Sequence, residues 1–305
     1  MTAFSLSTWK AKDTILSLVE GVWALGFAIA GRFCRAPVNN WSSPGQQRVL
    51  VIAPHPDDEV VGCAGTIVQH KNCGDEVCIV YITDGRRSRA LGLGPEEMAC
   101  RRRQEAEAGA KSLGIDRFEW FGLPEGDWTA EQLQPPLQAL MNQVAPHLIY
   151  APSRIDFHPD HHKVATVLMT LLPDQPVELP APLIRIYQSQ VPLTPVLTNL
   201  VFDTSGVRRE RAAAFTVYTT QLDNIGRALR QRRYAARFYG ITQEAEEFWQ
   251  MTAHQYCLLH CLPPDPWPVH TFRSLRSHSF SDPLAYLHGL SERRRFAGLV
   301  RQQSC

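Results

Sequence analysis

Two short histidine motifs hold most of the chemistry in this sequence. The motif HPDDE occupies positions 55–59 after the apolar run 49–52, and HPDHH occupies positions 158–162 after the apolar run 147–152. Proline suits the first position of a helix, and acidic residues suit the positive end of its dipole. A capped helix start therefore explains either motif alone. Capping does not require histidine, however, and two His-Pro-Asp junctions in one chain are hard to assign to capping alone.

Both motifs are expected to face one crevice. In an open parallel sheet the carboxyl ends of the strands lie along one edge, and ligands bind there. A catalytic zinc ion takes three nitrogen or oxygen ligands and keeps one open position. His55, Asp58 and His161 supply two imidazoles and one carboxylate, so they are the predicted metal ligands. The residues that remain for proton transfer are Asp57, His158 and Asp160.

These motifs resemble those of the PIG-L/LmbE-like family of zinc-dependent N-deacetylases. The resemblance lies in APHPDDE at 53–59 followed by HPDH at 158–161, and it extends from about residue 48 to about residue 250. It implies an α/β fold of three layers, Rossmann-like, with a mostly parallel sheet and helices on both faces. It also implies a hydrolase that removes the acetyl group from an N-acetylglucosamine-containing substrate, namely a glycolipid, a glycan precursor or a small glycoside.

Amide hydrolysis at neutral pH needs an activated water, a polarised carbonyl and a proton for the departing amine. One Zn²⁺ per chain on the predicted ligands meets the first two needs, and Fe²⁺ is an alternative because sequence indicates ligand type better than metal identity. Asp57 is expected to act as the general base. His158, as an imidazolium oriented by Asp160, is expected to stabilise the oxyanion or protonate the amine. Asp156 stands where some family members carry a tyrosine.

The resemblance assigns four further residues to the substrate side of the site. Asp84 lies in a TDG sequence that family members place beside the metal pocket, although a tight turn also explains it. Arg102 matches an RxxE position expected near the sugar, although a surface ion pair with Glu105 is the simpler interpretation. Glu125 and Asp127 lie in LPEGD, which the family places at the pocket rim to bind sugar hydroxyls. A Pro-Gly turn is the alternative there.

Apolar runs and helical segments alternate along the first half of the chain. Strands are expected at 49–52, 77–82, 118–121 and 147–152, with helices at 60–71, 95–113, 129–144 and after the second motif. Four such units imply a parallel sheet with right-handed crossovers. The GCAG sequence at 62–65 lacks the GxGxxG spacing of a nucleotide loop and is expected to pack a helix closely on the sheet. An extended run at 183–188, another at 201–202, and helices at 207–220 and 225–239 follow.

The composition is that of a globular protein and gives no indication of a nucleic-acid partner. The chain has 305 residues, of which 44% are hydrophobic and 20% charged, enough for one α/β domain with a substantial core. Its 31 basic and 30 acidic residues balance, so no nucleic-acid partner is expected. Eight scattered cysteines lack the spacing of a disulfide scaffold, which indicates reduced thiols and a cytoplasmic location. HQYCLLHC at 254–261 lacks a paired CxxC and is expected to be an ordinary buried helix.

Three regions are expected. Residues 1–46 form an apolar N-terminal segment and linker, 47–262 form the LmbE-like deacetylase domain, and 263–305 form a C-terminal extension of unknown role. The run 15–30 is apolar, but it contains Glu20 and is shorter than a membrane span of about 20 residues. It is expected to remain uncleaved and to pack on the domain or lie at a membrane surface. Peripheral membrane contact would suit a lipid-linked sugar substrate.

Two other functions remain open at this point. A non-catalytic α/β module that holds a metal or a nucleotide would share the fold, but it leaves Asp57 and His158 without a role beside a complete ligand set. A zinc amidohydrolase acting on a different amide, such as an amino-sugar conjugate or a small thiol-precursor glycoside, would share the site. Acetate release from a panel of N-acetylglucosaminyl compounds separates the three possibilities.

Overall fold

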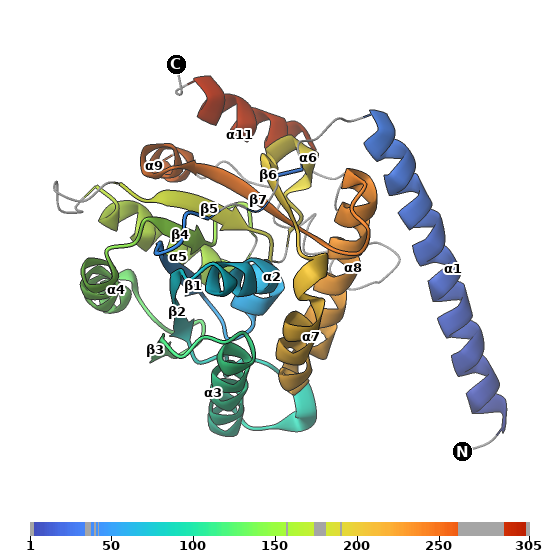
Figure 1. Ribbon diagram of the computed structural model, residues 1–305. Helices are drawn as coiled ribbons and strands as arrows, with labels where there is room; N and C mark the ends of the chain where they lie inside the picture. Colours follow the sequence, from blue (N-terminus) through green and yellow to red (C-terminus); the bar gives the residue numbers. More distant parts are fainter. Residues whose placement is uncertain are drawn as a thin grey trace.

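A computed structural model describes residues 3–33, 38–39, 41, 43–156, 158–173, 181–189, 191–261 and 290–302. Among these residues a seven-stranded sheet forms the centre, in the order β3-β2-β1-β4-β5-β7-β6 (Figure 1). The strands are β1 (Arg48–Ala53), β2 (Glu76–Thr83), β3 (Phe118–Leu123), β4 (Leu148–Ala151), β5 (Leu183–Tyr187), β6 (Leu200–Asp203) and β7 (Ala245–Thr252). Strands β1 to β5 pair in parallel, and β7 runs antiparallel to both of its neighbours.

Helices cover both faces of the sheet. They are α1 (Ala3–Phe33), α2 (Asp58–Asn72), α3 (Pro95–Ser112), α4 (Ala130–Val144), α5 (Pro159–Leu171), α6 (Thr194–Leu197), α7 (Arg208–Val217), α8 (Leu222–Tyr239), α9 (Ala253–Cys261) and α11 (Leu290–Gln302), with 3₁₀ turns η1 (Ala90–Gly92), η2 (Ser205–Val207) and η3 (Thr219–Gln221). One core lies under α2, α3, α7 and α8, and the other lies under α4, α5, α9 and α11. The predicted three-layer α/β fold is therefore confirmed.

Strand β1 shows why the continuous apolar runs form the middle of this sheet. Val49 and Val51 point into one core, and Leu50 and Ile52 point into the other. A strand buried on both faces needs apolar residues at every position rather than at alternate positions. The four predicted strand–helix units all form, with β1 between β2 and β4.

The glycines at 62–65 lie inside α2, as predicted. A Cβ atom on Gly62 would lie 2.5 Å from the Tyr187 ring, and one on Gly65 would lie 2.5 Å from Cβ of Thr204. Close packing of the helix on the sheet therefore requires glycine at both positions. The helix is not regular, however, because Cys63 between them has φ −150° and ψ 25°.

Strand β7 was not predicted. Its sequence AEEFWQMT begins with adjacent glutamates, Glu246 and Glu247, which the hydropathy pattern indicates to be surface residues. Both are buried, and β7 lies between β5 and β6. The strand completes the far side of the sheet and carries carboxylates into the interior.

The expected N-terminal helix is present and lies beside α8 at the outside of the molecule (Figure 1). Phe27 stacks on Tyr234 of α8 with ring centroids 5.0 Å apart, and Gly31 lies directly against the backbone of Phe238. In the part of the chain that the structure describes, no helix is both long and apolar enough to cross a membrane.

The predicted division into three regions stays a prediction. Residues 262–289, which contain the start of the predicted C-terminal extension, lie outside the described residues. Helix α11 lies beyond the predicted boundary, and its residues Phe296, Ala297 and Val300 belong to the same core as α4, α5 and α9. That part of the extension therefore packs on the domain.

Candidate active site

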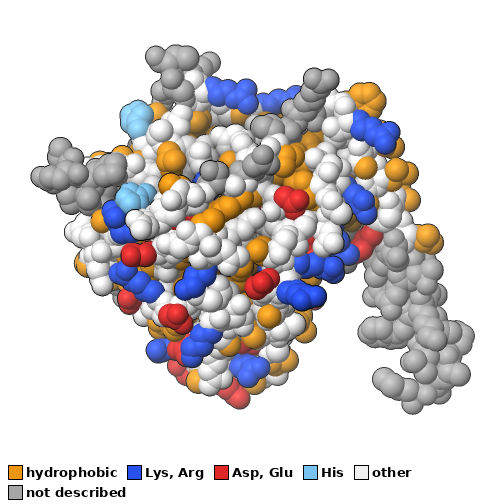
Figure 2. Space-filling view, in the orientation of Figure 1, with side chains coloured by type: hydrophobic (Ala, Val, Ile, Leu, Met, Phe, Trp, Pro, Cys, Tyr) orange, Lys and Arg blue, Asp and Glu red, His pale blue; other side chains and the backbone are white. Residues whose placement is uncertain are grey.

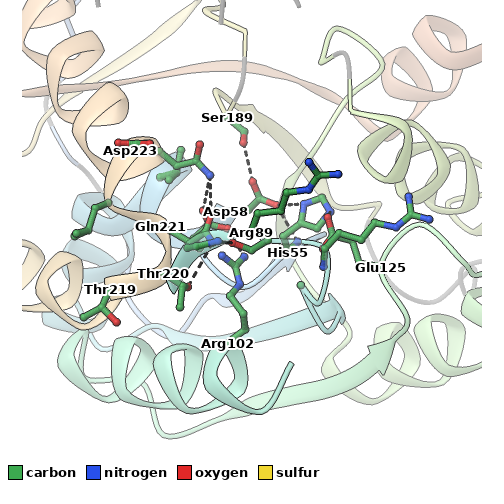
Figure 3. Close-up of a pocket in the computed structure, with 18 of the residues that line it drawn as sticks. His55, Asp58, Arg89, Arg102, Glu125, Ser189, Thr219, Thr220, Gln221 and Asp223 are labelled. Carbon is green, nitrogen blue, oxygen red and sulfur yellow. Dashed lines mark hydrogen bonds and ion pairs between the residues drawn. The ribbon is translucent and has the colours of Figure 1, made fainter. Parts of the chain in front are cut away.

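The two histidine motifs meet at the carboxyl edge of the sheet. Strands β1 and β4 are hydrogen-bonded neighbours, and each motif follows directly from one of them. His55 lies in the turn after β1 and Asp58 begins α2, whereas His158 precedes α5 and His161 lies in its first turn. Figure 3 shows His55 and Asp58 side by side in the resulting pocket. The expectation that both motifs face one crevice is confirmed.

Three donor atoms form a small triangle. His55 Nδ1 lies 3.2 Å from Asp58 Oδ2 and 3.2 Å from His161 Nε2, and His161 Nε2 lies 3.1 Å from Asp58 Oδ2. Ligands on a tetrahedral zinc ion with metal–ligand distances near 2.0 Å lie roughly 3.3 Å apart. All three side chains are buried, and Ser189 Oγ donates to the other carboxylate oxygen of Asp58 at 2.7 Å. The size and chemistry of this donor set fit a metal ion.

Each of the two histidines carries a carboxylate on its far nitrogen. His55 Nε2 lies 3.3 Å from Asp160 Oδ2, and His161 Nδ1 lies 3.2 Å from Asp156 Oδ2. A carboxylate in this place accepts a hydrogen bond from the ring N–H, so the opposite nitrogen keeps its lone pair free to bind a metal. Both rings are therefore oriented with their lone pairs toward the triangle.

The charges around the triangle favour a cation. Burial lowers the pKa of His55, but the carboxylates of Asp160 and Asp58 offset this and raise it to about 9. Burial also lowers the pKa of His161, but Asp58 and Asp156 raise it well above the ordinary value. Three carboxylates thus surround two imidazoles, and either protons or a divalent cation would balance their charge.

His158 lies against this triangle. Its ring centroid is 4.4 Å from that of His55, and the ring Nδ1 accepts a hydrogen bond of 3.2 Å from the Asp160 backbone N–H. Of the described residues, His55, His158 and His161 form one group able to hold a metal ion, and His55, Glu125, His158 and Asp160 form another. The structure therefore has a histidine–carboxylate cluster able to bind a metal.

These contacts correct the predicted state of His158 and the predicted role of Asp160. The Asp160 carboxylate lies on His55 and accepts from the Trp128 indole N–H at 2.9 Å, so only its backbone orients His158. Burial lowers the pKa of His158 to about 3, and the neighbouring His55 and His161 contribute to this shift. The lowered pKa and the accepting Nδ1 favour a neutral imidazole with its proton on Nε2, whereas the sequence analysis expects an imidazolium.

Asp57 has an unusual backbone conformation. Its φ of 146° lies in a region that residues other than glycine rarely adopt. Arg102 Nη2 donates to Oδ1 at 2.9 Å, Asn224 Nδ2 donates to Oδ2 at 3.3 Å, and the Asp57 N–H donates to Glu59 Oε2 at 3.2 Å. Burial raises the pKa of the Asp57 carboxyl, while Arg102 opposes that shift. The carboxylate is thus held from both sides at the edge of the pocket.

Arg102 and Glu125 line the pocket, as the sequence predicted. Arg102 is only 2% exposed, and its Nε and Nη1 have no hydrogen-bond partner among the described residues. It contacts Asp57, so the alternative of a surface pair with Glu105 is wrong. Glu125 Oε1 lies 3.7 Å from His55 Nε2, and its other oxygen accepts from the backbone of Arg87.

Asp84 and Asp127 occupy other places. Of the described residues, those that line this pocket include neither of them. Asp84 accepts hydrogen bonds from the backbone N–H groups of Arg86 and Glu125, so it ties the turn after β2 to the turn after β3. Asp127 is exposed and lines an adjacent hollow. The structure supports a turn-forming role for Asp84, and direct substrate contact in the main pocket is assigned to neither residue.

One wall of the pocket was not predicted. The pocket has a volume of about 710 Å³ and is closed on one side by the junction between α7 and α8, where Thr219, Thr220, Gln221 and Asp223 face it in Figure 3. Glu105 of α3 anchors this wall by accepting from both threonine hydroxyls at 2.7 and 2.6 Å. The sequence predicted a helix up to Thr220 and another from Ile225, and it assigned no role to the mostly polar residues 219–224 at their junction.

Part of the chain is similar to known deacetylases. Residues 50–172 match the family model PIG-L, described as GlcNAc-PI de-N-acetylase. The diacetylchitobiose deacetylase of Thermococcus kodakarensis is 31% identical over 121 residues, which are 38% of this chain and 45% of that protein. The 1D-myo-inositol 2-acetamido-2-deoxy-alpha-D-glucopyranoside deacetylase of Mycobacterium sp. (strain KMS) is 28% identical over 151 residues, 39% of this chain and 49% of its own. The chain thus spans about half the length of these relatives.

Solved structures share the fold. The N,N'-diacetylchitobiose deacetylase from Pyrococcus horikoshii has a TM-score of 0.59 and 24% identity, and the match covers 72% of this chain and 88% of that one. The 4-carboxy-2-hydroxymuconate hydratase GalB from Pseudomonas putida has a TM-score of 0.56 and 22% identity, with 67% and 95% covered. Because a hydratase shares the architecture, the fold by itself does not identify the reaction.

Proposed function

We propose that this chain is a zinc-dependent N-deacetylase, and the match of residues 50–172 to the PIG-L family model supports the proposal. Its substrate contains N-acetylglucosamine, and its products are acetate and a free amine. The observation that carries the proposal is the triangle of His55 Nδ1, Asp58 Oδ2 and His161 Nε2 beside the buried carboxylate of Asp57. The relatives named above support the acetylated amino sugar as the substrate class.

The metal ligands in this proposal are His55, Asp58 and His161. Two imidazoles and one carboxylate suit Zn²⁺, and the same set accepts Fe²⁺. A zinc ion bound there supplies Lewis-acid chemistry, lowering the pKa of a water molecule and polarising a carbonyl oxygen. Asp160 and Asp156 orient the two histidine rings and are positioning residues rather than reacting ones.

Asp57 is the proposed general base. Its two oxygens are held by Arg102 and Asn224, so the carboxylate cannot rotate away from the pocket that it lines. It takes a proton from the water that attacks the acetyl carbon, and it returns that proton to the nitrogen as the C–N bond breaks. This transfer leaves a neutral amine and requires no second acid.

His158 is the proposed hydrogen-bond donor to the reacting oxygen. Because its Nδ1 accepts from the Asp160 backbone, its proton is on Nε2, and the residue lines the pocket. A neutral imidazole held in place donates to the oxygen on which negative charge develops. Burial lowers the pKa of His158, which favours the neutral form, so in this proposal the oxyanion support does not depend on a charged imidazolium.

The pocket accommodates more than one sugar ring. Its volume of about 710 Å³ lies within the range of roughly 300–1,000 Å³ that holds a drug-sized ligand. Arg102 lines the pocket, and its Nε and Nη1 have no hydrogen-bond partner among the described residues, so we assign them to sugar hydroxyls. Arg87, Arg89 and Arg227 line the outer part, and they favour a substituent with negative charge beyond the sugar. A glycoside or a lipid-linked sugar with an anionic link meets both conditions.

Helix α1 supports contact with an anionic membrane surface. Leu18, Val22, Leu25, Ile29 and Phe33 recur at helical spacing and are between 48% and 84% exposed, whereas the opposite side packs on α8. Figure 2 shows hydrophobic and basic side chains together at the described part of α1. The arginines that line the hollow beside α1 are Arg208, Arg230, Arg233 and Arg237. An apolar stripe beside basic residues suits anionic lipid head groups. A cytoplasmic location remains a prediction from the cysteine pattern.

Acetate release tests the proposed activity. Purified protein loaded with Zn²⁺ or Fe²⁺ is expected to release acetate from N-acetylglucosaminyl compounds, and His161→Ala is expected to lose both metal and activity because two ligands bind weakly. His254→Ala, at an exposed histidine of α9, is the matched control and should retain both. Metal-loaded wild type that leaves every N-acetylglucosaminyl compound intact would contradict the proposal and favour a different amide or a binding module.

A further inference from the structure

Helix α2 is broken after the turn that carries a proposed metal ligand. Cys63 has φ −150° and ψ 25°, so it separates the short piece Asp58–Gly62 from the longer piece that begins at Ala64. Asp58 is the first residue of the short piece, and Asp57 precedes it. The direction in which both carboxylates point therefore depends on how the short piece is held.

A guanidinium from α8 binds the carbonyl side of the break. Arg232 Nη2 donates to the carbonyl oxygens of Val60 and Val61, each at 2.9 Å. In a regular helix these carbonyls would accept from N–H groups four residues later, across the position of Cys63. Arg232 is 5% exposed, so the contact lies inside the protein rather than at its surface.

A carboxylate from β7 binds the amide side of the break. Glu246 accepts from the backbone N–H of Gly65 at 2.7 Å and from that of Thr66 at 2.9 Å, one with each oxygen. These are the N–H groups that an internal helix start leaves without partners. Glu246 Oε1 also lies 2.8 Å from Arg232 Nη2. The ion pair therefore replaces the backbone bonds that the break removes.

We infer that Arg232 and Glu246 are positioning residues for the metal site. The pair fixes the short piece of α2 in the orientation that brings Asp58 Oδ2 to His55 and His161. Without the ion pair, the buried carbonyl and N–H groups at the break lack partners. A regular helix through Cys63 would restore their hydrogen bonds to one another. Because a helix turns by about 100° per residue, this change would rotate the short piece and move Asp58. The inference rests on the proposed metal site. Both residues lie outside the 50–172 segment that matches the family model.

A second buried ion pair provides a matched control. Arg211 of α7 contacts Glu244, which precedes β7, and donates from Nη1 to Thr204 Oγ1 at 3.2 Å. Both members are less than 10% exposed, as in the first pair. Loss of either arginine leaves a buried carboxylate without its partner and lowers stability. Among the described residues Arg211 makes no hydrogen bond to the backbone of α2, so its loss leaves the contacts of Arg232 and Glu246 with α2 in place.

The experiment compares Arg232→Met with Arg211→Met in the full chain. Zinc affinity is measured by chelator competition on protein shown to be folded by circular dichroism, and the visible absorption of bound Co²⁺ reports ligand geometry. Arg232→Met is expected to bind zinc about 10- to 100-fold more weakly than wild type, the usual effect of losing a group that orients a ligand, and to alter the Co²⁺ spectrum. Arg211→Met is expected to keep both at wild-type values.

Two further variants keep the test decisive. Arg232→Lys retains the charge without the planar fork and is expected to recover part of the affinity. Glu246→Gln keeps one acceptor oxygen, and it takes the place of Arg232→Met if that variant does not fold. Wild-type affinity and spectrum in folded Arg232→Met, or an equal loss in Arg211→Met, would overturn the inference. Wild-type protein that binds neither ion would remove the metal site itself, whereas intact binding without acetate release bears on the proposed activity alone.

Discussion

Asp57 forms a buried ion pair with Arg102, so its substitution can affect both catalysis and stability. Arg102 Nη2 lies 2.9 Å from Asp57 Oδ1, and the two side chains are only 3% and 7% exposed. Asp57→Asn removes the carboxylate that neutralises a buried guanidinium. Breaking such a pair from one side costs about 3–5 kcal/mol, because the remaining charge stays buried without its partner. A loss of turnover in this variant alone could therefore reflect a disturbed fold.

The double variant Asp57→Asn/Arg102→Met resolves this. Removing both charges leaves no uncompensated guanidinium, so the two single effects should not add, and a coupling of about 2–3 kcal/mol is expected in the free energy of unfolding. Turnover behaves differently, because a general base contributes roughly 10²- to 10⁴-fold whether or not the arginine is present. The double variant is therefore expected to regain stability while its turnover is no higher than that of Asp57→Asn, since Arg102 is also assigned to the substrate.

The two quantities need different conditions. Urea unfolding is followed with a chelator present, because a bound metal stabilises the folded state and would mask the difference. Turnover is measured at saturating zinc with metal content checked in each variant. Zinc-loaded Asp57→Asn with turnover within about tenfold of wild type would refute the base assignment. Single-variant losses that simply add in the double variant would refute the ion-pair argument.

Two other predictions concern stability and membrane contact. Burial raises the pKa of Glu247 from 4.5 to about 7, against opposing hydrogen bonds, so its contribution is fully present below about pH 4.5 and is lost as the pH rises through 7. As the pH rises between those limits, the free energy of unfolding of Glu247→Gln should therefore gain about 3 kcal/mol relative to wild type. Glu210→Gln, at an exposed site, should show no such gain. Equal pH profiles of unfolding for all three proteins would contradict this prediction. The double variant Val22→Glu/Leu25→Glu should lose binding to anionic vesicles while keeping its turnover, and undiminished sedimentation with such vesicles would exclude the α1 stripe as the contact.

The sequence predicted that His55, Asp58 and His161 would lie together, because parallel strands place their carboxyl ends at one edge of the sheet. His55, Asp58 and His161 follow two apolar runs, and a parallel sheet brings such positions together whenever the two strands are neighbours. That β1 and β4 are hydrogen-bonded neighbours is a tertiary fact that local patterns do not contain. The hydrogen bond from Ser189 to Asp58 could therefore not be predicted from the sequence, because it depends on β5 lying next to β4.

The role of Asp160 shows where reasoning from adjacency failed. Its place two residues after His158 indicated that the two side chains interact. At a helix start, however, the N–H groups point back toward the capping residue, so the backbone of Asp160 meets His158. Its carboxylate points away from the helix and reaches His55 across the sheet edge. Asp84 also differs from its expected role beside the metal pocket, because its carboxylate accepts hydrogen bonds from backbone N–H groups of two turns.

Two departures from regular local structure lie close to the proposed ligand Asp58 in the sequence. Asp57 has a positive φ and Cys63 interrupts α2, and neither conformation is what its sequence neighbours favour. Such conformations persist only when surrounding contacts determine them. Arg102 and Asn224 hold the side chain of Asp57. At the break in α2 the contacts come from Arg232 and Glu246, which lie more than 160 residues away along the chain. Local patterns predicted neither the break in α2 nor the buried acid of β7, because Glu246 reaches the N–H groups of Gly65 and Thr66 only through the tertiary fold.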